Sequence, residues 1–580
     1  MRTPLALLAA TAVLALPTLS TAAAQPQQPN YLNQRDIQEA ARQHPEIVEE
    51  FGGALTGPRA AYVEGVGRRV AAYSGTANAG QVYHFTTLNS AVENAFAVPG
   101  GYVYLTRQLM GIINDEAELA FVMGHETGHI AAIHHQQRKS AQQSSAVWGV
   151  LGAVLGAVVG NNAFGGLISQ GAQQFSKARL LSFSRDQEYQ ADVLGIRYLT
   201  SAGYDPNAGA TMLGQLTRAS ALEARLQGDR SRSTPEWAST HPLSENRMAQ
   251  ASQLSRQTGR AGQGLRNRDV FLSQLDGAMV DDDPEQGVID GRSFTHPDLG
   301  MQFIVPTGYL MQNGSRAVTI QGSGAQAQFS GGRYTGGIDN YIYEVLQGLT
   351  EGKVQLQMGQ IQRTTINGIP ASYVTARANS SSGSIDVSVF AYQWNRDTMY
   401  HFLTLTRGGY GLQPFASMVN SLRRISPAEA AAIRPKVIDV VTVQRGDTIQ
   451  GLASRMAYRD YQLDRFLALN GLNANSPLVP GQKVKLVIYG TRTLACSIYI
   501  AASSSESSRP HMPFEPPPSL LKLLMMATPI SAAISPYSIA VAPRLSERSR
   551  PIVRIANTPP SSDPGPLCRF NANLIKDSLA

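Results

Sequence analysis

Two histidines and a glutamate in the first quarter of the chain have the types and spacing of a metal-dependent hydrolytic centre. His125 and His129 flank Glu126 in the sequence HETGH, which continues an apolar-periodic segment that begins near Asp115 and predicts a helix. Because each helical residue turns about 100°, the two histidines lie one turn apart on one face. Imidazoles at that spacing can hold one zinc ion, with the glutamate beside them as a base toward water. The alternative is a buried structural histidine pair.

A catalytic zinc site needs a third protein ligand and one open position. His135 has the spacing of a three-histidine zinc motif, but that motif requires glycine where this chain has Ala132. The residues around Ala132 favour a continued helix, which would turn His134 and His135 away from the ligand face. The sequence therefore argues against a zinc site with His135 as the third ligand.

The other candidate ligand is Glu188, which Asp192 follows four residues later on one face of a second predicted helix. Glu188 would bind the ion, and Asp192 would accept a hydrogen bond from the free ring nitrogen of a ligand histidine. The alternative role for this acidic face is pairing with Arg185 or Arg197.

Four ordered segments between about Tyr31 and Gln257 resemble the zinc peptidases of family M48, the gluzincin-type envelope and CAAX-processing proteases. The segments are NSAVENAFAVPGGYVYL (89–105), HETGH (125–129), SRDQEYQADVLG (184–195) and THPLSENR (240–247). The resemblance implies a mainly helical peptidase domain with a small edge sheet.

The same resemblance assigns roles to individual residues. It implies one zinc ion per chain, with Glu188 as the third ligand after His125 and His129. It also implies Glu126 as the general base and Asp192 as the hydrogen-bond partner of His125.

The late THPLSENR segment offers His241 and Arg247 as catalytic donors to the charged tetrahedral intermediate of peptide hydrolysis. In relatives the histidine of this block can also occupy the open zinc position, which would make His241 a switch. Arg247 could instead pair with a carboxylate of the core. The strand that carries Asn94, Ala95, Phe96 and Ala97 borders the cleft in the family, where an edge can bind extended substrate by strand addition. A core hairpin is the alternative for that strand.

The N-terminal residues predict export. Met1-Arg2 precedes an apolar run from Pro4 to Leu16 and a small-residue cleavage pattern that ends near Gln25. This is the organisation of a signal peptide, so we expect residues 1–24 to be removed and the mature protein to be periplasmic. No cysteine lies directly after the run, because Cys496 and Cys568 are both near the C-terminal end, and this excludes a lipoprotein anchor.

Charge and hydrophobicity along the chain indicate whether the protein binds nucleic acid or a membrane. The net charge is +7, but no basic stripe or stacking motif accompanies it, so we exclude nucleic acid. Residues 146–168 are apolar and rich in glycine and alanine, but their uncharged core is shorter than the ~20 residues that span a bilayer. We expect a helical hairpin there, with peripheral membrane contact.

At 580 residues the chain should hold several domains. We predict an α+β multidomain protein, in which a zinc metallopeptidase domain precedes a β-rich α+β domain of short alternating segments. The expected boundaries are peptidase 25–265, linker 266–290, β-rich domain 291–430, LysM-like module 438–489 and a disordered or aberrant tail 490–580.

The module over 438–489 resembles a LysM domain of βααβ order. The resemblance rests on its opening Gly446-Asp447-Thr448, its middle Asn470-Gly471 and its closing Pro480-Gly481-Gln482. It implies binding of N-acetylglucosamine-containing glycans such as peptidoglycan, with a purely structural module as the alternative.

These observations predict an exported zinc endopeptidase that cleaves unfolded or misassembled proteins of the cell envelope. Two other hypotheses stay open: a peptidoglycan-associated zinc hydrolase, and a largely non-hydrolytic periplasmic chaperone or assembly factor.

Overall fold

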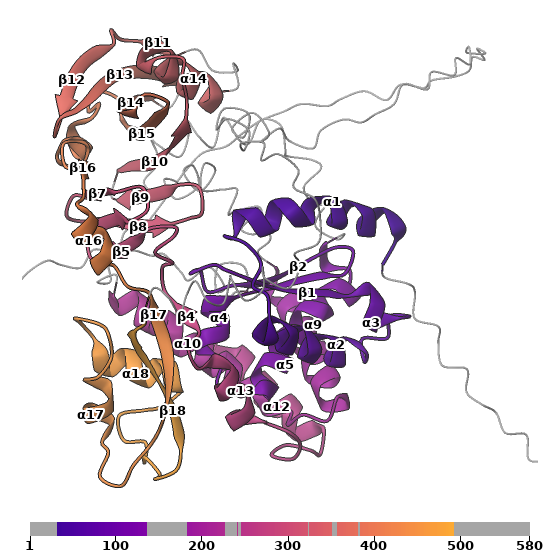
Figure 1. Ribbon diagram of the computed structural model, residues 1–580. Helices are drawn as coiled ribbons and strands as arrows, with labels where there is room; N and C mark the ends of the chain where they lie inside the picture. Colours follow the sequence, from indigo (N-terminus) through magenta and orange to yellow (C-terminus); the bar gives the residue numbers. More distant parts are fainter. Residues whose placement is uncertain are drawn as a thin grey trace, which may run out of the picture. The chain divides into compact units, whose positions relative to one another are not determined.

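The computed structural model has the α+β multidomain architecture predicted from the sequence (Figure 1). It describes residues 32–135, 183–226, 241, 245–322, 324–350, 356–380 and 383–491. The predicted signal peptide (1–24), the apolar segment 146–168 and nearly all of the tail, including both cysteines, lie outside these residues. None of the helices in the described ranges combines the length and the apolarity needed to cross a membrane.

The first region is mainly helical and is built around α5 (Glu116–Ala131). Every residue of α5 is buried, as expected for a helix that neighbours cover on all sides. The helix begins where the Asp115 side chain accepts a hydrogen bond from the backbone N–H of Glu118. The other helices of this region are α1 (Gln34–Glu50), α2 (Pro58–Ala71), α3 (Ala79–Val82), α4 (Arg107–Ile112), α9 (Arg185–Ser201), α10 (Ala208–Leu226) and α12 (Glu245–Gln257).

A three-stranded sheet accompanies these helices, as predicted. Its strands are β1 (His84–Leu88), β2 (Ala95–Val98) and β3 (Tyr102–Thr106) in the order β1-β3-β2. β2 and β3 are antiparallel and connected by a tight turn at Gly100 and Gly101, whose φ angles of 105° and 95° suit glycine. Among the described residues, β2 pairs with a strand on one side only.

The segment 266–290 is not the linker expected from the sequence. It forms α13 (Arg268–Leu275), β4 (Met279–Val280) and β5 (Val288–Asp290). The physical reason is the helical spacing of Phe271, Leu272 and Leu275, whose side chains are buried in the core of the helical region.

The β-rich region contains an eight-stranded antiparallel sheet and a four-stranded sheet. Helix α14 contacts β13 and β14 and covers one core of the larger sheet (Figure 1). The further elements are β6 (Ser293–His296), β7 (Met301–Ile304), β8 (Tyr309–Asn313), β9 (Val318–Gly322), β10 (Ala325–Arg333), α14 (Ile338–Thr350), β11 (Gln357–Met358), β12 (Gln362–Ile366), β13 (Ile369–Ser380), β14 (Gly383–Asn395), β15 (Thr398–Arg407), η3 (Gln413–Phe415), α15 (Ala416–Val419), β16 (Arg423–Arg424) and α16 (Pro427–Ala432).

The last described region has the predicted βααβ order, drawn in orange in Figure 1. β17 pairs with β18 in antiparallel orientation, and its first residues also pair with β4. The elements are β17 (Lys436–Thr442), α17 (Ile449–Ala453), α18 (Gln462–Asn470) and β18 (Lys483–Tyr489).

Candidate metal centre

Close packing of α5 against α9 brings the candidate ligands together. A Cβ at Gly128 would lie 3.1 Å from Leu194 Cβ, and one at Gly195 would lie 3.0 Å from the backbone nitrogen of His125. These glycines therefore allow the two helices to approach more closely than side chains would permit. Helix α9 begins with a capping box between Ser184 and Gln187, which fixes the turn that carries Glu188.

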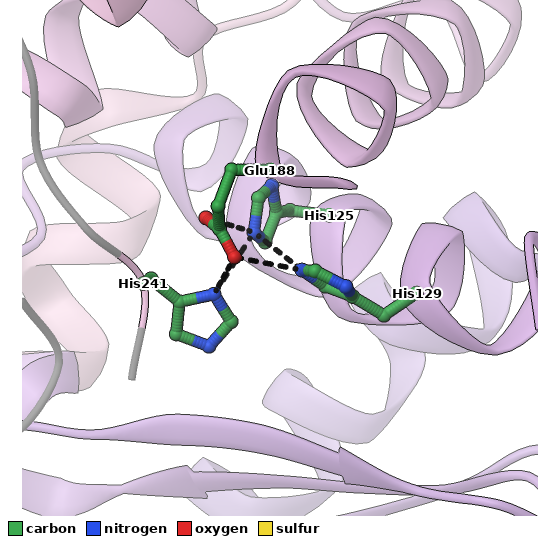
Figure 2. A group of neighbouring side chains, drawn as sticks. All are labelled: His125, His129, Glu188 and His241. Carbon is green, nitrogen blue, oxygen red and sulfur yellow. Dashed lines mark hydrogen bonds and ion pairs between the residues drawn. The ribbon is translucent and has the colours of Figure 1, made fainter. Parts of the chain in front are cut away.

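Four side chains converge at this contact (Figure 2). His125 Nε2 lies 3.1 Å from His129 Nε2, and Glu188 Oε1 lies 3.4 Å from His129 Nε2. His241 Nδ1 lies 2.9 Å from Glu188 Oε1 and 3.3 Å from His125 Nε2. All four side chains are buried.

The donor set fits zinc. Ligands held about 2.1 Å from a tetrahedral zinc ion are separated by about 3.4 Å, which is close to the spacing of these atoms. Two imidazoles and a carboxylate are the ligands of a gluzincin-type site, and His241 occupies the direction of a fourth ligand. His135 is not part of the cluster, and its ring instead packs edge-on against Phe183.

Glu126 is the unusual member of the site. Its side chain is fully buried, and neither carboxyl oxygen has a hydrogen-bond partner among the described residues. His241 Nε2 lies 3.5 Å from Oε1, at ion-pair distance. Burial raises the pKa of Glu126, which favours proton uptake. A buried carboxylate with no hydrogen-bond donor among the described residues destabilises the fold, so its presence beside the cluster indicates a chemical role.

Asp192 contacts the ring nitrogen of His125 that faces away from the cluster, and Arg247 in turn contacts Asp192. Asp192 Oδ1 lies 3.0 Å from His125 Nδ1, and Arg247 donates to both Asp192 oxygens at 2.7 and 2.8 Å. Arg247 Nη1 also lies 2.8 Å from Glu188 Oε2. Despite burial, Arg247 helps to lower the pKa of Asp192, so the carboxylate is charged. The arginine that the sequence offered as a transition-state donor thus pairs with two carboxylates of the site.

The charges of the site also suit a cation. Burial alone would lower the pKa of His125, but Asp192 and Glu188 outweigh it and raise that pKa to about 9. Two carboxylates within 3.6 Å of the His125 ring therefore favour positive charge at this position.

Replacing Arg247 by methionine should destabilise the metal-free protein by about 3–5 kcal/mol, because it leaves two buried carboxylates without their cation. Urea denaturation measures this loss. Arg247→Lys is the matched control: it keeps the charge without the two-pronged contact, so it should restore part of the stability. Equal stability of wild type and Arg247→Met would contradict the structural role.

The strand expected to bind substrate lies partly in the core. The Thr106 backbone N–H donates to the Asn94 carbonyl oxygen, and the Asn94 backbone N–H donates to Thr106 Oγ1. The Phe96 ring stacks on Tyr104 with 4.8 Å between centroids. The side chains of Asn94, Ala95, Phe96 and Ala97 are all buried. Any contact of this strand with an extended peptide would therefore use its backbone edge.

The structure also shows contacts that the sequence analysis missed. Helix α5 ends at Ala131 instead of continuing, and His134 folds back to His129. The ring of Phe183 stacks on His129 with centroids 3.7 Å apart. No sequence signal marks Phe183, because its role depends on where the chain enters α9.

Comparisons with known proteins agree with this geometry. Residues 58–255 match the model of peptidase family M48, and residues 441–487 match the LysM domain. The beta-barrel assembly-enhancing protease of Escherichia coli (strain K12) is 32% identical over 199 residues, which cover 34% of this chain and 39% of that protein. The corresponding protease of Yersinia pestis is 33% identical over 205 residues, covering 34% and 39% of the two chains.

A eukaryotic relative matches over a similar region. The mitochondrial metalloendopeptidase OMA1 of Schizosaccharomyces pombe is 27% identical over 206 residues, which cover 35% of this chain and 56% of that protein. In each case the match spans less than two thirds of the relative's length. The chain thus contains a region that matches peptidase family M48 and holds a buried donor cluster that fits zinc, followed by a region that matches the LysM domain.

Proposed function

We propose that this chain is a zinc-dependent endopeptidase. The observation that carries the proposal is the buried carboxylate of Glu126, which accepts no hydrogen bond from the described residues, beside the cluster of His125, His129 and Glu188. That pairing of a ligand set with a free base is what peptide hydrolysis needs, whereas a structural zinc site has no use for the base.

The residues divide the chemistry as follows. A zinc ion held by His125, His129 and Glu188 would supply an acidified water and polarise the scissile carbonyl. Glu126 takes the proton of the attacking water and delivers it to the leaving amine. Asp192 keeps His125 oriented with its Nε2 toward the ligand cluster.

His241 keeps the site closed in this arrangement. Its Nδ1 lies within 3.3 Å of both His125 and Glu188, and its Nε2 faces Glu126. If His241 took the fourth position of a zinc ion held by His125, His129 and Glu188, no position would be left for water. Hydrolysis requires His241 to move away, and we assign it the role of a switch rather than of a catalytic donor.

The substrates and location follow from the relatives and the second domain. Two bacterial relatives are named for beta-barrel assembly. We therefore infer that the substrates are unfolded or misassembled proteins of the cell envelope, in the periplasm. The LysM loops around 444–446 and 473–475 are exposed, which leaves them available to peptidoglycan.

The test is degradation of casein by purified residues 25–490 carrying one zinc ion. Cleavage should stop when a chelator removes the metal and return when zinc is added back, because the site cannot activate water without zinc. Release of muropeptides from peptidoglycan without casein cleavage would favour a wall hydrolase and overturn the proposal.

Two further outcomes separate the remaining possibilities. Cleavage by His241→Ala but not by wild type would identify the closed form as self-inhibited. If neither protein cleaves casein while both prevent its aggregation, the chain is a chaperone and the endopeptidase proposal fails.

A further inference from the structure

The chain makes a strained turn directly after the metal-binding helix. Helix α5 ends at Ala131, and Ile133 then adopts a φ of 53°. A positive φ is unfavourable for a β-branched residue and persists only where other contacts enforce it. The turn reverses the chain and returns the next residue, His134, toward the helix that it has just left.

His134 contacts the ligand His129 on the ring edge opposite the cluster. His129 Nδ1 and His134 Nδ1 lie 2.9 Å apart, whereas His129 Nε2 faces His125 and Glu188. The other ring nitrogen of His134, Nε2, lies 3.1 Å from Gln190 Oε1 on α9. The side chain of His134 is fully buried.

These contacts fix the tautomers when His129 binds metal through Nε2. His129 then carries its proton on Nδ1 and must donate it. The acceptor is His134 Nδ1, so His134 carries its own proton on Nε2. The side-chain oxygen Oε1 of Gln190 accepts the hydrogen bond from this Nε2–H.

We propose that His134 is a positioning residue that accepts the Nδ1–H of the ligand His129, with its tautomer set by Gln190. The inference rests on the proposed zinc site. It gives the two ligand histidines different supports: the charged carboxylate of Asp192 for His125, and a neutral imidazole for His129. A neutral acceptor orients the ligand ring without adding another negative charge beside Glu188.

The ring of His129 is therefore held in two directions. Phe183 stacks on its face at an interplanar angle of 23°, and His134 bonds its edge. Stacking alone permits the ring to rotate in its own plane, whereas the hydrogen bond fixes where Nε2 points. Loss of the bond should thus weaken metal binding more than it weakens the fold.

The experiment measures the zinc dissociation constant of the full chain by competition with a chelating dye. His134→Phe should bind zinc 10–100-fold more weakly, the usual effect of losing the acceptor behind a ligand histidine. His134→Asn should bind within about 3-fold of wild type, because the asparagine oxygen takes nearly the position of Nδ1. His134→Gln places its amide one carbon further out and should resemble His134→Phe.

The rescue by asparagine distinguishes positioning from packing, because asparagine fills the buried space less well than phenylalanine. His135→Phe is the matched control: it alters the neighbouring histidine and keeps a ring against Phe183, so zinc affinity should change less than about 3-fold. Thermal melts of the metal-free variants report any loss of folding separately.

Each outcome decides the inference. Wild-type affinity for zinc in His134→Phe, or equal weakening in the asparagine and glutamine variants, would overturn the role of His134 and leave the zinc site intact. Should His134→Phe fail to fold, the asparagine and glutamine pair still gives the answer. Absence of zinc binding by the wild type would instead reject the proposed function, and the inference with it.

Discussion

Replacement of Glu126 by glutamine is expected to lower the rate of casein cleavage by about 10²–10⁴-fold, the typical contribution of a positioned general base. The amide has nearly the shape of the carboxylate but cannot accept a proton from water. The comparison requires zinc-loaded wild type and variant at equal concentration, with the initial rate of peptide release as the readout.

The variant also has expected properties that remain unchanged. Glu126 is not among the four clustered ligand residues, so zinc content should stay at one ion per chain. Sedimentation with peptidoglycan through the LysM domain should match the wild type. Cleavage at the wild-type rate would show that Glu126 is not the base, whereas loss of zinc would show that it is a ligand.

Stability provides an independent test of the same residue. Because neither carboxyl oxygen of Glu126 has a hydrogen-bond partner in the described part of the chain, we expect the wild type to be destabilised by a buried polar group that function requires. The metal-free glutamine variant should therefore be at least as stable as the wild type. A marked loss of stability would mean that the carboxylate has a structural partner.

Sequence spacing predicts the parts of the site that lie within one helix. His125 and His129 share a face of α5, and Glu188 and Asp192 share a face of α9, because separations of four residues determine both. Spacing within each helix does not state that α5 packs against α9. The structure shows that this packing depends on Gly128 of α5 and Gly195 of α9, which allow the two helices to approach closely.

The contacts of His134 could not be predicted from the local sequence. Propensity favours continued helix through Ile130-Ala-Ala-Ile, and a continued helix would point His134 away from His129. The actual turn needs Ile133 in a left-handed conformation that local propensity disfavours. Tertiary contacts therefore override propensity at this site, as expected where structure serves function.

The sequence also suggested that the peptidase region and the LysM domain are separate modules connected by linkers. In the structure the two share a hydrophobic core and a sheet. Phe466, Val484 and Leu486 of the LysM domain belong to the same buried cluster as Met110 and Leu272 of the helical region. Strand β17 pairs with β4, which extends the LysM sheet into the segment expected to be a linker. The alternating pattern of a strand does not state which partner it pairs with.

A buried lysine strengthens this junction. Lys485 on β18 is fully buried, and its Nζ donates to the carbonyl oxygens of Gly111 and Ile113 at 2.8 and 2.7 Å. These carbonyls lie at the C-terminal end of α4, where backbone acceptors lack helical partners and favour a cation. Gln215 of α10 donates to the Ala468 carbonyl on α18. The LysM domain thus completes hydrogen bonds and core packing of the peptidase.

We therefore expect Ile438→Asp to destabilise the peptidase region, although Ile438 lies on β17, which forms a sheet with β18 of the LysM domain. Its side chain is fully buried in the shared cluster, and an unpaired carboxylate there should lower the free energy of unfolding by about 4 kcal/mol. That loss corresponds to roughly 10 °C in Tm for domains of this size. Calorimetry should show the LysM domain and the helical region unfolding in one shared transition, at the temperature where casein cleavage is lost.

Val479→Asp is the matched control, because it places the same charge in the LysM domain on a side chain that is 57% exposed. It should change stability by less than about 0.5 kcal/mol. If Ile438→Asp instead gives a separate early transition while casein cleavage survives, the LysM domain folds independently and serves only as a tether. A single shared transition would mean that the exposed loops of the LysM domain are built on part of the core that holds the metal centre, so that the two belong to one cooperative unit.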